Sequence, residues 1–141
     1  MPHEDGAAYA PIVATVSLGA SICLDITKKS WPEEDTSKAA PQISAPASEF
    51  KVPARILQEP RSLLVTTGAA YSDLLHGIAP IETDENLNAE TVANWNLLAN
   101  PQTFEEAGGR NERATRISLT YRDVRKTSSA ANKILGGFGK R

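Results

Sequence analysis

The first residues of the chain carry side chains suited to metal chemistry. The sequence opens MPHEDG, so His3 and Asp5 stand two positions apart. In an extended segment, side chains at positions i and i+2 point to the same side, so an imidazole and a carboxylate could meet one ion there. The first residues of a chain are usually frayed, whereas metal ligands have to be held in place. The pair therefore raises the question of what holds it.

The second histidine of the chain, His76, stands in the stretch DLLHG. Two histidines and one carboxylate bind one face of Fe(II) and leave the other coordination positions open. A His-x-Asp pair alone is weak evidence, because it arises by chance in many proteins. A single histidine before Gly77 is more often a capping or surface residue. The histidines therefore need a third element before they indicate a metal site.

The stretch RISLTYR is that third element, because polar and apolar side chains alternate along it. The polar side chains on one face of this strand are Arg116, Ser118, Thr120 and Arg122. The apolar side chains on the other face are Ile117, Leu119 and Tyr121. An ordinary half-exposed strand would turn its polar face to solvent. A binding strand would turn it into a pocket for a dicarboxylate, since a guanidinium holds a carboxylate through two parallel hydrogen bonds.

Together these motifs resemble the AlkB family of Fe(II)/2-oxoglutarate-dependent dioxygenases. The stretches ATVSLG, EPRSLLV and LLHGI follow in the order typical of the family, and the pattern is most similar to the sixth eukaryotic AlkB homologue. The resemblance covers residues 3–28, 57–81 and 115–126 and is interrupted by two insertions. An ordered set of motifs is much more specific than any one of them.

The resemblance implies roles for individual residues. The implied ligands of Fe(II) are His3, Asp5 and His76, with no catalytic residue beyond them. The implied cosubstrate residues are Arg116 on the far carboxylate of 2-oxoglutarate, Arg122 near the carboxylate that chelates iron, and Ser118 where relatives use a polar side chain. The two arginines are six residues apart, roughly 20 Å along a straight strand. Both can touch one small acid only if the strand bends.

The resemblance also implies an activity and its partners. Oxygen and 2-oxoglutarate would yield succinate and carbon dioxide, while an N-methyl group on a base of DNA or RNA is hydroxylated and leaves as formaldehyde. We expect a monomer that works away from membranes, in the nucleus or the cytoplasm. Two other functions stay open, namely a β-scaffold without catalytic activity and a cupin-like module that binds metal without oxidising anything.

The position of the His-x-Asp motif bears on the extent of the chain. In family members this motif lies mid-chain, with about as much protein before it as after it. The resemblance therefore implies that the chain is a C-terminal fragment, wholly active only in a longer form. His3 and Asp5 would then stand at the terminus because the part of the domain that normally precedes and supports them belongs to the longer form.

Several elements are expected to position these residues. Residues 12–27 predict two strands with a turn at Gly19, because the stretch is rich in β-branched side chains. Residues 61–67 and 115–122 predict further strands. The stretch AAYSDLLHG predicts a short helix closed by Gly77, and NAETVANWNLLANP predicts a longer helix in which Trp95 packs against the core. Residues 103–112 are polar and Gly-rich, which predicts a loop.

Short strands, one helix and two long insertions predict an all-β fold. The resemblance narrows this to a double-stranded β-helix, or jelly roll, that is incomplete at its N-terminal side. We expect residues 1–126 to be the C-terminal part of a dioxygenase domain. It would contain a disordered insertion at 30–54 and a helix-containing insertion at 82–112, and a flexible basic tail would follow at 127–141.

Composition sets limits on these expectations. The chain has 141 residues, of which 40% are apolar and 23% charged, as in one ordinary globular domain. Its single cysteine, Cys23, excludes an internal disulfide, fits a reducing compartment and is expected in the core. No stretch reaches the roughly 20 apolar residues of a membrane helix. Residues 110–141 carry nine basic and two acidic side chains, so they suit either contact with phosphates or a solvated tail.

Overall fold

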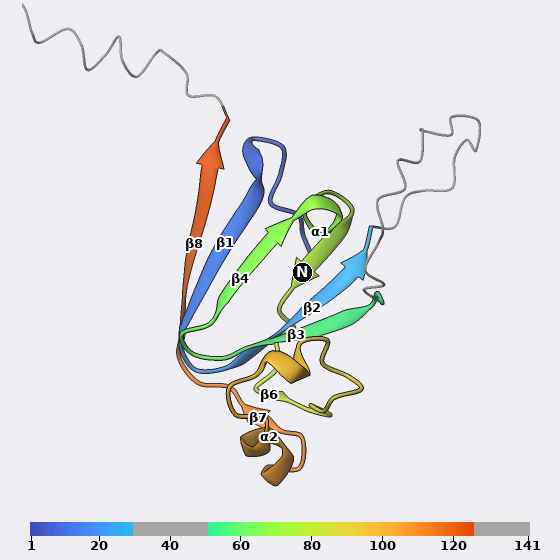
Figure 1. The fold of residues 1–141 in the computed structure, drawn as a ribbon, viewed down its shortest axis with the longest axis vertical. Helices are drawn as coiled ribbons and strands as arrows, with labels where there is room; N and C mark the ends of the chain where they lie inside the picture. Colours follow the sequence, from blue (N-terminus) through green and yellow to red (C-terminus); the bar gives the residue numbers. More distant parts are fainter. Residues whose placement is uncertain (30–50, 126–141) are drawn as a thin grey trace, which may run out of the picture.

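Antiparallel strands make up most of the described chain. The computed structural model describes residues 1–29 and 51–125 (Figure 1). The first three-stranded sheet has the order β4 (Leu63–Thr67), β1 (Tyr9–Gly19) and β8 (Arg116–Val124). The second has the order β3 (Ala54–Gln58), β2 (Ile22–Lys28) and β5 (Leu74–Gly77). A short pair joins β6 (Thr83–Asp84) to β7 (Asn111–Glu112), so the predicted all-β class is confirmed.

The turn between β1 and β2 carries the chain from one sheet into the other. Gly19 has a φ of +85°, a conformation that side chains with a Cβ rarely adopt. A Cβ at this position would also lie 2.5 Å from the carbonyl oxygen of Thr115. The predicted pair of strands with a turn at Gly19 is therefore confirmed, and the turn is packed against the start of β8.

The strand predicted at residues 115–122 is β8, which pairs with β1 along most of its length. Ser118 lies opposite Ser17, and Arg122 lies opposite Val13. Ile117, Leu119 and Tyr121 of β8 lie on the face opposite its polar side chains and are exposed. The exposed large apolar residues of this sheet are Ile12, Leu63, Val65, Ile117, Leu119, Tyr121 and Val124.

The prediction of one helix from residue 69 to a cap at Gly77 is wrong. The helix α1 (Gly68–Ser72) ends before it, and Leu74–Gly77 forms β5. In β5, His76 lies opposite Ile26 of β2. Pairing with a neighbouring strand overrides local helix propensity here, as tertiary contacts often do.

The longer helix predicted at residues 88–101 is also wrong, because only the 3-10 turn η1 (Trp95–Leu97) forms. Asparagine side chains hold this segment in irregular turns. The Asn88 Oδ1 accepts a hydrogen bond from the Glu90 amide at 2.9 Å, and Asn94 bonds both the amide and the carbonyl of Leu57 at 2.9 Å. Such side-chain bonds compete with helix formation. A helix forms instead in the predicted loop, as α2 (Gln102–Glu106).

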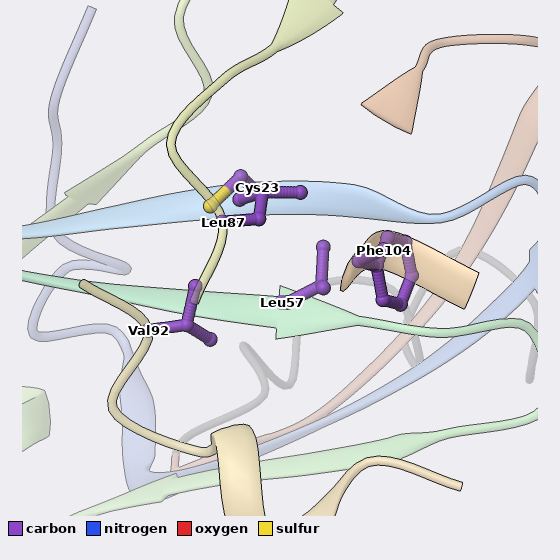
Figure 2. Close-up of a cluster of buried hydrophobic side chains, with 5 residues drawn as sticks. All are labelled: Cys23, Leu57, Leu87, Val92 and Phe104. Atoms are coloured by element: carbon purple, nitrogen blue, oxygen red, sulfur yellow. The ribbon is translucent and has the colours of Figure 1, made fainter. Parts of the chain in front are cut away.

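Buried apolar side chains lie on both sides of the second sheet, with Leu24 and Ile26 on one side and a larger cluster on the other. Figure 2 shows Cys23 on β2, Leu57 on β3 and Phe104 on α2 facing one another. Leu87 and Val92 complete this cluster, and Trp95 and Leu98 pack against it. The expected core positions of Cys23 and Trp95 are confirmed. Residues 84–107 thus supply one wall of the core.

Two of the expected segments lie wholly or mostly outside the described residues. These are the insertion at 30–54, of which only its last four residues are described, and the tail at 127–141. Ala54, the last residue of that expected insertion, begins β3. Within 1–29 and 51–125, no helix has the length and apolar character needed to cross a membrane.

Candidate functional site

A cavity of about 490 Å³ is lined by both three-stranded sheets and by the first residues of the chain. All four polar side chains of the β8 face line it, at positions 116, 118, 120 and 122. The polar face of β8 thus lines a cavity that is open to solvent, because Arg116 is half-buried whereas Ser118, Thr120 and Arg122 are exposed. Apolar side chains of β2, β3 and β4, including Ile26, Ile56 and Leu64, form other parts of the wall.

The N-terminal segment is held beside β5 by its backbone. The His3 amide donates to the carbonyl of His76 at 2.9 Å, and the His76 amide donates to the carbonyl of His3 at 3.0 Å. The Tyr71 hydroxyl donates to the carbonyl of Gly6 at 2.7 Å, and Lys29 forms an ion pair with Glu4. These contacts explain how residues so close to the terminus can be positioned.

The two histidines and the aspartate come together at one end of the cavity. The ring centroids of His3 and His76 are 4.5 Å apart, and the His76 Nε2 lies 3.9 Å from the Asp5 Oδ2. Burial lowers the pKa of His76, although the nearby Asp5 acts in the opposite direction. The imidazole is therefore neutral over a wider pH range, which is the form that binds metals.

The three side chains do not stand in a ready-made ligand arrangement. Within the described ranges, no group of three or more His, Cys, Asp or Glu side chains is placed to hold a metal. The Asp5 carboxylate is taken up by Arg122, whose Nε donates to Oδ1 at 2.8 Å. The Asp5 side chain is only 4% exposed, so this pair is largely shielded from water.

Arg116 and Arg122 point to different partners. Arg122 lies at the Asp5 end of β8, with its guanidinium 5.5 Å from the ring centre of Tyr9. Arg116 lies at the other end, opposite Gly19. A bend in β8 would be needed only if both arginines contacted one small acid directly. In the structure the two guanidinium groups bond different residues. Ser118 lines the cavity between them.

Arg116 is bound by uncharged groups. Its Nε donates to the Ser17 Oγ at 2.9 Å, and its Nη2 donates to the Gln58 Oε1 at 2.8 Å. It makes no ion pair with any residue in the part of the chain that the structure describes. Burial lowers its pKa. A partly desolvated cation that lines a cavity without an acidic partner is well suited to bind an anion.

Sequence reasoning missed Ser17 and Gln58. Ser17 lies on the same face of β1 as Val13 and Thr15, so the period of two in IVATVSL could have placed it on the cavity face. Gln58 ends a strand that was not predicted, and the sequence carries no comparable signal for it.

Comparison with known proteins decides the family resemblance. No protein-family model matches the chain. Over 136 residues, or 96% of its length, the chain is 34% identical to a Danio rerio protein named "Probable RNA/DNA demethylase ALKBH6". The predicted resemblance to AlkB homologues is confirmed. The AlkB-like chain spans about half of that relative, 52% of its length.

Proposed function

We propose that this AlkB-like chain is part of an Fe(II)- and 2-oxoglutarate-dependent dioxygenase that demethylates N-methylated bases of DNA or RNA. The similarity to a protein named as a probable RNA/DNA demethylase supports this. One structural observation carries it: a single cavity holds His3, Asp5 and His76 near one end of β8 and Arg116, which lacks an acidic partner among the described residues, near the other.

The donor set fits a metal of this kind. Two imidazoles and one carboxylate suit Fe(II), and His76 is biased to its neutral form. His3, Asp5 and His76 would hold the ion, with the Asp5 carboxylate shared with or released from Arg122. When bound, Fe(II) would supply the activation of oxygen that hydroxylation of an N-methyl group requires.

The chain's own residues would bind and orient the cosubstrate. Arg116 would hold the far carboxylate of 2-oxoglutarate, and Ser118 would line its path along β8. Arg122 is bonded to Asp5 and would orient the Asp5 carboxylate as a metal ligand. It would also provide positive charge near the carboxylate of 2-oxoglutarate that chelates the metal. A volume of about 490 Å³ lies within the range of small-ligand pockets.

We also propose a fold and an organisation for the domain. The two facing three-stranded sheets would be part of a double-stranded β-helix within residues 1–126. Residues 82–112 would be an insertion that packs against the side of β2 and β3 away from the cavity. The contacts of Leu87, Val92 and Phe104 with Cys23 and Leu57 support this arrangement.

One feature favours a different function, a β-scaffold or metal-binding module without oxygenase activity. The Asp5 carboxylate is already paired with Arg122, and no three ligands in the described ranges are arranged for a metal. In that case the cavity would bind anions or metal but consume no 2-oxoglutarate.

Turnover distinguishes these functions. The chain, joined to the preceding part of the demethylase relative, is incubated with Fe(II), ascorbate, 2-oxoglutarate and a methylated single-stranded oligonucleotide, and succinate and formaldehyde are measured. We expect iron-dependent succinate, which Asp5→Asn abolishes and the exposed control Asp73→Asn leaves unchanged. Metal binding without any succinate from the joined protein would contradict the proposal and favour the non-catalytic module.

A further inference from the structure

A closed triangle of hydrogen bonds joins Ser17, Gln58 and Arg116 at the wall of the cavity. The Ser17 Oγ donates to the Gln58 Oε1 at 3.0 Å, and the Arg116 guanidinium donates to both oxygens. Ser17 is 0% exposed and Gln58 is 4% exposed. The three side chains come from β1, β3 and β8, so the triangle also bridges the two three-stranded sheets.

The triangle occupies one edge of the guanidinium. An arginine has five N–H donors, and the Nε–H and one Nη2–H lie parallel along one edge of the group. Ser17 and Gln58 accept from that edge. The donors left over are on Nη1 and on the outer side of Nη2, and these form the end-on fork that also fits a carboxylate.

We propose that Ser17 and Gln58 are positioning residues that present the end-on fork of Arg116 to the second carboxylate of a dicarboxylate ligand. This inference rests on the proposed function and names the residues that set its selectivity. Because both acceptors are neutral, they fix the orientation of the guanidinium and leave its charge for the ligand.

The identity of residue 58 is therefore decisive. A glutamate has nearly the same shape as Gln58 but would place a carboxylate within hydrogen-bond distance of Nη2. Arg116 would then form an internal ion pair, and an incoming carboxylate would meet a neutralised site. A merely structural clasp between the sheets would tolerate this change or become tighter.

The test compares ligands with one and two carboxylates. Glutarate, which needs no metal, is titrated into the whole chain and followed by NMR, with butyrate as the ligand that lacks the second carboxylate. We expect Gln58→Glu to weaken glutarate binding roughly tenfold or more, since a charge-assisted bond is lost. Butyrate should bind the wild-type chain as weakly as glutarate binds the Gln58→Glu variant. The control Gln102→Glu adds the same charge on exposed α2 and should leave glutarate binding unchanged.

A second variant guards against misfolding. Ser17→Ala removes one acceptor without adding charge, and we expect a several-fold loss of glutarate binding together with faster exchange of the Arg116 Nε proton. The midpoint temperature of thermal unfolding should be unchanged or higher in Gln58→Glu. Equal glutarate binding by wild type and Gln58→Glu would overturn the inference, whether or not succinate is formed.

The proposed function and this inference can fail separately. Glutarate binding that depends on Gln58, without succinate formation, would support the inference and contradict the dioxygenase. Succinate formation that is unaffected by Gln58→Glu would do the reverse. A wild-type chain that neither binds glutarate nor forms succinate would overturn both.

Discussion

Arg122 donates to the Oδ1 of Asp5 through both Nε and Nη2, and this pair occupies the carboxylate that the proposed metal site requires. The Asp5 side chain is almost fully buried. A buried carboxylate needs a charged or hydrogen-bonding partner. Arg122 therefore holds the Asp5 carboxylate in place beside His76, and a metal ion would have to share the carboxylate with it.

Metal binding should depend on His76. We expect His76→Ala to abolish binding of Co(II), used as a spectroscopic substitute for Fe(II), because only His3 and Asp5 would remain. Cys23→Ala should retain binding, since Cys23 lies in the core cluster and does not line the cavity. Visible absorption titrations measure both. Equal Co(II) affinity in wild type and His76→Ala would remove the basis for the proposed ligands.

Binding of 2-oxoglutarate should depend on the shape of the Arg116 side chain as well as its charge. Arg116→Lys keeps the charge but loses the planar fork, so we expect roughly tenfold weaker binding. Arg122→Lys should cost less, because Arg122 is engaged with Asp5. Isothermal titration in the presence of Mn(II) measures both, with the exposed Arg110→Lys as control. The reverse order of the first two variants would exchange the proposed roles.

The closeness of Gly77 to the N-terminal segment leads to a third prediction. A Cβ on Gly77 would lie 3.0 Å from the Cα of Pro2, a backbone atom that can move away only with its segment. Gly77→Ala should therefore displace His3 and weaken Co(II) binding while the core remains folded. Tyr71→Phe, which removes the hydrogen bond to Gly6, should also weaken Co(II) binding, by about 1 kcal/mol in the free energy of binding. Unchanged Co(II) binding in Gly77→Ala would show that the segment adjusts freely.

A buried ion pair beside the core should govern stability. Asp84 is 2% exposed, and its carboxylate accepts from Arg113 at 2.6 and 3.2 Å. Asp84→Asn would leave the guanidinium without its counter-charge, so we expect a loss of about 3–5 kcal/mol in the free energy of unfolding. Glu85→Gln removes the exposed pair with Arg110 and should cost about 0–1 kcal/mol. Urea unfolding tests the difference, and similar losses in both variants would contradict it.

Cys23 predicts how stability changes at alkaline pH. Burial raises the pKa of its thiol from 9.0 to about 12. Above about pH 9 the unfolded chain releases the thiol proton while the folded chain keeps it, so stability falls as the pH rises from 9 towards 12. The excess slope over Cys23→Ala should approach about 1.4 kcal/mol per pH unit. Parallel stability curves for the two chains in urea unfolding would refute the assignment.

The features that the sequence predicted correctly depend on local periodicity. The polar face of residues 116–122 follows from a period of two, which is a property of the strand alone. The turn at Gly19 follows from the same kind of local signal. The strand β3 was missed because its pairing partner, β2, is separated from it along the chain by residues 29–53.

The wrong predictions share one physical origin, which is contact between residues that are far apart in the sequence. The apolar spacing of residues 88–101 suits a helix, but Asn94 bonds the backbone of Leu57, 37 residues away. The candidate site shows this limit too. His3, Asp5 and His76 were singled out by residue type, whereas the contact of Arg122 with Asp5 and of Arg116 with Gln58 depends on how two sheets face each other.

The larger hydrophobic cluster lies beside the second sheet alone, which makes the two sheets unequal. The cluster of Cys23, Leu57 and Phe104 secures β2 and β3, whereas the outer face of the β4-β1-β8 sheet carries exposed apolar side chains. Local opening costs least where few apolar contacts are buried. Amide hydrogens of β4 and β8 should thus exchange with deuterium sooner than those of β2 and β3. The strand that bears Arg116 and Arg122 belongs to the layer that opens first, so a ligand bridging both sheets would slow that exchange as it binds.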